Sequence, residues 1–513
     1  MSDVLTAPAA NDAAVATNAA AVLAIRPQPL GIFPLPAGYL LVPAGPDTEA
    51  AREALVAGRA PKVWPDRLRA YELALAGDRE GALAALAEAG SDPVTRYNRF
   101  VLDPDGGSLV SSDGSGLVGS DRSGLRAAEG GGLAGSDAGG LLGSDGGSLV
   151  GQPEFAEVST QNCRPESAQA ALRADLGELG PLVDLVSFVL GRAEVPPEPG
   201  AAEGELAAVL LSAQAAHELA AGEPTEALRL LHQAARTARP VAPPLAGLML
   251  GAAAAISQEV FGLGPDGPAG APGAAGLYEQ ALLALSGAED LRVGRAELHL
   301  GLAGALHELA GQQPHQLARA IPHYHAVLQL ITVDQAPELW AAAHANLATA
   351  YLTMPMTQAS DQLRLGVAVQ SLRHALKVYT PETHPDRWAS TQLNLANSLV
   401  YTPSSHQEEN LVEALELYEA VLQVRGRDAD PVGRARVLAN QGNVLAHLGQ
   451  FDQAKAKLHE ARFLFEEFSD GDSVRMVRGV LDEIARQQTL LKSQGHAQDQ
   501  GHVQDHAQAQ DQP

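Results

Sequence analysis

Asparagines at regular spacing are the side chains of this chain best suited to recognition. Asn394 and Asn397 stand three residues apart, and Asn440 and Asn443 repeat that arrangement 46 positions later. A carboxamide can donate to a peptide carbonyl and accept from a peptide N–H, so a row of asparagines can hold an extended segment whatever its side chains. The alternative is a structural role in which Asn394 and Asn440 bridge neighbouring helices or cap turns. The spacing therefore indicates either a backbone-binding ladder or an internal seam.

Histidines are numerous, but their spacing does not predict a metal site. The chain holds 16 of them. His323 and His325 are two apart within a helical run, so they point to different faces, and no HExxH sequence occurs. His217, His307 and His447 each lie near the end of a helical run, where a partly positive imidazole interacts favourably with the helix dipole. We therefore expect structural histidines, no metal site and no cofactor.

Sequence motifs of catalysis are missing from the chain. It contains no nucleophile elbow, phosphate-binding loop, dinucleotide fingerprint or kinase motif. The glycines of GLAGALHELAG lie inside a helical run with no strand before it. We therefore predict that the protein is not an enzyme and has no catalytic residue.

The elements that position these side chains are predicted pairs of amphipathic helices. About six such pairs follow one another over residues 205–469. Matching positions, at steps of 45, 48 and 46 residues, are Gly301, Asn346, Asn394 and Asn440. A period of this length is typical of a helical solenoid, whose exposed apolar end needs a cap. The run 470–493 supplies the predicted capping helix.

The sixth unit has the sequence NQGNVLAHLGQFDQAKAKLHEARFLFEE, and in this pattern of small, large and turn residues it resembles the tetratricopeptide repeat (TPR) family. The fifth unit, HPDRWASTQLNLANSL with NLVEALELYEAVL, is similar to the long-repeat subgroup seen in kinesin light chains. Turns lengthened by MPMTQASD and TPSSHQEE depart from the family pattern, and the resemblance covers about residues 205–492. The C-terminal units also look like proteins encoded beside nickel-iron hydrogenases in actinobacteria. The small, large, turn and helix-packing positions of the TPR consensus are matched by Gly442, Leu445, Gly449, Phe451, Ala454, Leu458 and Ala461.

This resemblance implies a right-handed α-solenoid in which the first helix of each pair, helix A, lines the concave surface. Residues three positions after the matched ones then face inward, as Thr349, Asn397 and Asn443 do. Arg436, near the start of a helix A, is placed either to meet an acidic partner segment or to pair internally. The predicted partner-binding residues are Asn397, Asn443, Asn394, Asn440, Asn346, Thr349 and Arg436.

Small residues in helix A predict where the second helix of a pair, helix B, crosses closely. Ala348, Ala396 and Gly442 occupy this position in successive units. A larger side chain there would push the two helices apart.

The first 204 residues predict a smaller helical domain with an interruption. Residues 1–46 are rich in Ala and Pro, and Pro34, Pro36 and Pro43 leave residues 30–46 as an apolar extended segment. We expect this segment to pack against helices, and the alternative is that it serves as a docking peptide. Residues 47–104 predict a short helical hairpin region, which 153–204 continue. Between them, residues 105–152 form six Gly/Ser/Asp/Leu octads. We interpret the octads as a flexible low-complexity linker, because one acid per octad gives too few oxygen ligands for a calcium-stabilised β-solenoid.

The C-terminal tail, residues 494–513, consists mainly of Gln, His, Asp and Ala. Because it has no core-forming residues, we expect it to be disordered. His496, His502 and His506 would bind nickel or zinc only weakly, as any histidine-rich tail does.

Composition restricts the class of partner and the compartment. The 46% hydrophobic and 4% aromatic content suits close-packed helices, and the net charge of −26 repels nucleic acid and anionic lipid surfaces. Cys163 is the only cysteine, which excludes an intrachain disulfide. The start lacks the basic region of a secretory signal, and no run of 18 apolar residues occurs. We expect a cytoplasmic protein that binds neither nucleic acid nor membrane.

The fold class predicted from the sequence is all-α, a right-handed TPR-like solenoid with a C-terminal capping helix and a small helical domain before it. The predicted function is a non-enzymatic interaction scaffold or adaptor that binds a partner protein or peptide on the concave surface. Two alternatives stay open. One is an accessory or assembly factor for a metalloenzyme such as a nickel-iron hydrogenase, and the other is a ligand- or peptide-sensing regulatory protein.

Overall fold

The computed structural model describes residues 22–23, 40–43, 45–104, 165–261, 273–355, 361–402, 404, 406–424, 426 and 430–509. Across these ranges the chain is helical apart from turns and one short antiparallel ladder, so the predicted all-α solenoid is confirmed. The octads and Cys163 lie outside the described residues.

The N-terminal domain is a group of short helices with a small ladder at its edge. In the ladder, β1 (Val22–Leu23) pairs with β2 (Leu41–Val42). Leu40, Leu41 and Val42 are buried, as expected for an extended segment that packs against helices. The helices are α1 Glu49–Val56, η1 Asp66–Leu68, α2 Arg69–Leu75, α3 Arg79–Ala89, α4 Pro93–Leu102, α5 Pro165–Asp175, η2 Gly177–Leu179 and α6 Pro181–Val189.

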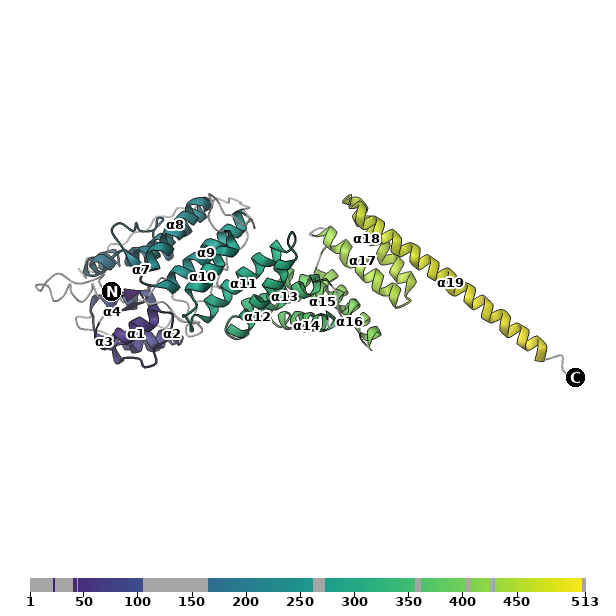
Figure 1. Cartoon of the computed structure of the whole chain (residues 1–513), viewed down its shortest axis with the longest axis horizontal. Helices are drawn as coiled ribbons and strands as arrows, with labels where there is room; N and C mark the ends of the chain where they lie inside the picture. Colours follow the sequence, from purple (N-terminus) through teal and green to yellow (C-terminus); the bar gives the residue numbers. More distant parts are fainter. Residues whose placement is uncertain are drawn as a thin grey trace, which may run out of the picture.

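Six antiparallel helix pairs form the solenoid, and they succeed one another along the long axis of the molecule (Figure 1). In each pair the odd-numbered helix is helix A and the even-numbered helix is helix B. The helices of the first three pairs are α7 Gly204–Ala220, α8 Pro224–Ala238, α9 Pro243–Phe261, α10 Ala274–Ala284, α11 Arg292–Leu309 and α12 His315–Leu330. Those of the last three are α13 Pro337–Thr353, α14 Asp361–Ala375, α15 Pro385–Tyr401, α16 Gln407–Val424, α17 Pro431–His447 and α18 Phe451–Glu467.

Local sequence signals set the ends of these helices. Proline takes the first turn of several of them, α15 and α17 included, where its missing N–H is not needed. The Asp430 carboxylate caps α17 by accepting a hydrogen bond from the Gly433 N–H at 2.8 Å. Gly222 and Gly449 end α7 and α17 with φ of 84° and 73°, a conformation that glycine adopts without strain.

The N-terminal domain packs against the first hairpins of the solenoid, and one continuous hydrophobic core runs through both. Figure 1 shows α1 to α4 beside α7 and α9 at one end of the molecule. The contact includes a clasp between distant turns: the Ala60 N–H donates to the Asp290 carboxylate at 2.7 Å, and the Asp290 N–H donates to the Gly58 carbonyl at 3.3 Å. Segments some 230 residues apart are thereby joined.

The tail differs from its prediction. The capping helix α19 runs from Gly471 to Ala509, so residues 494–509, which we expected to be disordered, are helical and project from the end of the solenoid (Figure 1). The composition of this segment gives no signal for a packed core, but that does not exclude a helix. Gln and Ala have good helix propensity, and a helix already nucleated by packing extends without a new nucleation cost.

Candidate functional site

An open hollow lies between two successive A helices, α15 and α17. Its volume is about 350 Å³. Helix α15 contributes Ser390, Leu393 and Asn394, and the start of α17 contributes Val432, Gly433 and Arg436, with the capping residue Asp430 beside them. Two of the predicted partner-binding residues, Asn394 and Arg436, therefore share one site.

The repeat places these side chains. Ser390 and Arg436 are 46 residues apart and occupy the same position in successive units. Asn394 lies four residues after Ser390, one helical turn further along the same face. The side chains of Leu393 and Val432 form an apolar part of the wall of the hollow. The hollow thus combines a cation, an amide and a hydroxyl over a partly apolar surface.

Arg436 is the exposed cation of the hollow. Its guanidinium makes no hydrogen bond or ion pair with another side chain of the described ranges. Hydrogen bonds from Ser473 lower the pKa of the Asp470 carboxyl, and the positive charge of Arg436 lowers it further. The Asn394 carboxamide is half-buried and likewise makes no hydrogen bond to a described residue. Both groups can therefore serve a ligand without first breaking an internal bond within this part of the chain.

Asn397 and Asn440 form an internal seam between helices. The Asn397 Oδ1 accepts hydrogen bonds from the Tyr418 hydroxyl at 2.6 Å and from the Asn440 Nδ2 at 2.9 Å. Tyr418 is buried on α16, so this one oxygen links α15, α16 and α17. These bonds are of the bridging kind given as the alternative for Asn440, and partner binding by Asn397 and Asn440 stays a prediction.

The remaining predicted residues lie apart from the hollow. Asn443, on α17, is half-buried, and Asn346, on α13, is exposed; neither carboxamide bonds to a described residue. The Thr349 hydroxyl donates to the Ala345 carbonyl of its own helix at 3.0 Å. The structure therefore groups Asn394 with Arg436 and leaves Asn346, Thr349 and Asn443 as separate candidates.

Five lining residues were not predicted: Ser390, Leu393, Asp430, Val432 and Gly433. The 46-residue step could have predicted Ser390 as a lining residue, because it aligns Ser390 with Arg436 in successive units. The capping role of Asp430 was also readable, since an Asp directly before a Pro at the start of a helical run is a typical N-terminus.

Histidines gather in the third and fourth hairpins, at the contact between helix A and helix B. The Nδ1 atoms of His299 and His323 lie 2.9 Å apart, and the rings of His344 and His374 stack at 4.8 Å. The edge of Trp340 meets both rings of the second pair. Within the described ranges no three His, Cys, Asp or Glu side chains gather in a way that could hold a metal ion.

Burial lowers the pKa of all four imidazoles and so favours their neutral form. It lowers the pKa of His299 to about 4, helped by the neighbouring His323 and Arg295. It lowers the pKa of His344 to about 4 as well, helped by His374, Lys377 and His325. A neutral imidazole can accept a hydrogen bond or stack on a second ring without charge repulsion.

The likenesses of this chain to known proteins described below are distant ones. No family model and no curated protein matches the chain. Among solved structures, the apo form of RapI is similar at 14% identity and a TM-score of 0.34, over 54% of this chain and 97% of that one. A Rap protein complexed with competence and sporulation factor is similar at 14% identity and a TM-score of 0.32, over 63% of this chain and 92% of that one. The fold is therefore assigned from the chain's own helices.

No helix in the described part of the chain combines the length and the apolar character that crossing a membrane requires.

Proposed function

We propose that the protein is a non-enzymatic interaction scaffold that binds an extended segment of a partner protein in the hollow between α15 and α17. The observation that carries this proposal is the pair Asn394 and Arg436. They come from successive repeats and line one open hollow, and neither side chain makes a hydrogen bond or an ion pair to another side chain in the described ranges.

The chemistry of the pair suits a peptide. The Asn394 carboxamide can pair with a backbone N–H or carbonyl, and the Arg436 guanidinium can form two parallel hydrogen bonds with a carboxylate. Leu393 and Val432 can bury an apolar side chain beside these polar groups. A volume of about 350 Å³ is enough for a few residues of an extended segment, so further contacts would continue along the A helices towards Asn443 or Asn346.

The test is affinity purification of the full-length protein from its native cells, followed by quantitative mass spectrometry. We expect Asn394→Ala combined with Arg436→Ala to reduce recovery of a specific partner at least tenfold, because both anchoring groups are lost. The binding-neutral control is Val412→Ala, on the exposed surface of helix B α16.

A second control separates binding from folding. Asn397→Ala removes the seam and leaves the Asn440 amide and the Tyr418 hydroxyl without their acceptor, which should lower stability by about 1 kcal/mol. Partner recovery should fall in the hollow variant, Asn394→Ala with Arg436→Ala, and stay unchanged in the seam variant, Asn397→Ala. All proteins are compared well below their unfolding temperatures. If the folded hollow variant kept every partner, the hollow would not be the binding site.

The alternatives of metalloenzyme assembly and ligand sensing stay predictions, because no contact in the described residues favours either of them.

A further inference from the structure

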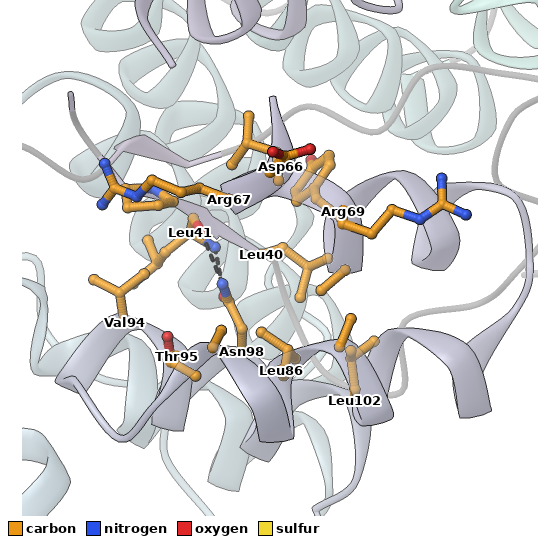
Figure 2. A pocket seen from close by; sticks show the side chains of 16 residues that line it. Leu40, Leu41, Asp66, Arg67, Arg69, Leu86, Val94, Thr95, Asn98 and Leu102 are labelled. Carbon is orange, nitrogen blue, oxygen red and sulfur yellow. Dashed lines mark hydrogen bonds between the residues drawn. The ribbon is translucent and has the colours of Figure 1, made fainter. Parts of the chain in front are cut away.

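The side chain of a buried asparagine in the N-terminal domain binds the backbone of an extended segment. The Asn98 Nδ2 donates to the Leu41 carbonyl at 2.8 Å, and the Asn98 Oδ1 accepts from the Leu41 N–H at 2.7 Å (Figure 2). The two residues are 57 positions apart, and Asn98 is only 7% exposed. One carboxamide therefore satisfies both backbone polar groups of one residue, Leu41, as the next strand of a sheet would.

This arrangement recognises a backbone and not a particular side chain. In an extended segment successive residues direct their polar groups to opposite edges, so Leu41 faces Asn98 while its neighbours face the other edge. That other edge is where β1 lies, with Val22 opposite Val42 and Leu23 opposite Leu41. The side chains of Leu40, Leu41 and Val42 are at most 2% exposed, so burial of their apolar surface also stabilises the bound segment.

The extended segment does not fill the cleft in which it lies. A cavity of about 70 Å³ remains beside it, lined mainly by apolar side chains of α2, α3 and α4. Figure 2 shows Leu86, Val94 and Leu102 on one side of the cavity and the two arginines Arg67 and Arg69 on the other. Close-packed interiors leave few such voids, so this one marks space beside Leu40 and Leu41 that the segment leaves unfilled.

We propose that α2, α3 and α4 form a second binding cleft, for an extended aliphatic peptide segment, and that residues 40–42 occupy this cleft in cis. The bound segment would place a backbone unit against Asn98 and consecutive large aliphatic side chains in the apolar cleft. This proposal does not depend on the hollow between α15 and α17.

A short tether makes the internal segment a strong competitor. The Thr48 hydroxyl donates to the Pro43 carbonyl at 2.8 Å, which ties the segment to the turn before α1. A short tether gives an effective concentration on the order of millimolar. An external peptide therefore gains access only when it binds more tightly than residues 40–42 or when that segment is weakened.

The experiment weakens the internal segment in the full-length protein. Leu41→Asp places a carboxylate in the apolar cleft and should release residues 40–42. The probe is a fluorescein-labelled peptide with the sequence of residues 38–45, followed by fluorescence anisotropy. We expect L41D to bind this peptide at least tenfold more tightly than the unaltered protein, and Asn98→Leu added to L41D to abolish the gain. Val63→Ala, on an exposed side chain, is the neutral control.

Hydrogen exchange of the unaltered protein supplies a second measurement that does not depend on the variant folding. The Leu41 amide should exchange through local release at least tenfold faster than the buried amide of Val101 in α4. A folded L41D protein that fails to bind the peptide would overturn the proposal. If L41D does not fold, the exchange measurement on the unaltered protein decides. Equal exchange rates for the Leu41 and Val101 amides would overturn the proposal, because residues 40–42 would then leave the cleft only when the whole core unfolds.

Discussion

Single residues of this solenoid are constrained most tightly where helix B crosses helix A. At Gly442 an added Cβ would lie 2.7 Å from the Leu458 Cγ and 3.2 Å from the Ala454 carbonyl oxygen. At Gly366, within α14, an added Cβ would meet nothing within 4 Å. The two glycines are both helical, so the comparison isolates packing from backbone entropy.

Gly442→Ala should destabilise the protein, and Gly366→Ala should stabilise it. The alanine at 366 gains roughly 0.5–1 kcal/mol because it restricts the unfolded chain and favours helix. At 442 the same gain is exceeded by an overpacking cost of about 1–3 kcal/mol. Urea unfolding of the two variants at neutral pH measures the difference, and equal midpoints would contradict close packing at Gly442.

At the scale of elements, paired side chains hold the two helices of a hairpin together. The His299–His323 pair joins α11 to α12, and the His344–His374 pair joins α13 to α14. Protonation weakens either pair, because a buried charge is poorly solvated and two charged rings in contact repel each other. These contacts therefore make the middle of the solenoid sensitive to acid.

The sign of this acid sensitivity follows from the pKa values. The ordinary histidine pKa of 6.5 falls to about 4 for His299 and for His344, so the folded state binds these protons more weakly than the unfolded state. Their contribution to stability is therefore complete above about pH 6.5 and is lost as the pH falls towards 4. We expect His299→Gln combined with His344→Gln to reduce the loss of stability between pH 7 and pH 4.5.

Urea unfolding at the two pH values tests this expectation. His406→Gln is the control, because the His406 side chain is 67% exposed and outside both pairs. A double variant as acid-sensitive as the parent would show that other groups cause the acid response.

At the scale of the whole molecule, the N-terminal domain is fixed to the solenoid by close contact between two turns. Gly58 has φ of 70°, and a Cβ there would lie 2.6 Å from the Ala288 Cβ. Gly77 has φ of 88°, but a Cβ there would meet nothing within 4 Å. At either position alanine costs roughly 1–2 kcal/mol, because the backbone is left-handed. The difference in stability between the G58A and G77A variants therefore reports the packing between the N-terminal domain and the solenoid.

Gly58→Ala should loosen the N-terminal domain, whereas Gly77→Ala should not. We expect faster hydrogen exchange at the Ala60 amide in G58A, because that N–H donates to Asp290 across the contact. The stability of G58A should also fall below that of G77A. Unchanged exchange at Ala60 in G58A would mean that the clasp tolerates a side chain at this turn.

Much of the fold was predictable because its signals are local. Prolines at helix starts, glycines at helix ends and a step of 45 to 48 residues identified the helix pairs. The tail was the exception among the elements, since residues 494–509 are helical although nothing in their composition could form a core. The candidate site was predicted only in part: Asn394 and Arg436 were named, but Ser390, Leu393, Asp430, Val432 and Gly433 were not.

The sequence by itself determined an all-α repeat array and the set of polar side chains that its A helices carry. Only the tertiary structure decided their use: Asn397 and Asn440 bond to each other, Asn394 and Arg436 line a hollow, and Asn98 holds Leu41. The physical reason is distance along the chain. The apolar periodicity of a helix and its capping residues act over a few residues. The hydrogen-bond partner of a carboxamide depends instead on how side chains from helices 40 or more residues apart meet in space.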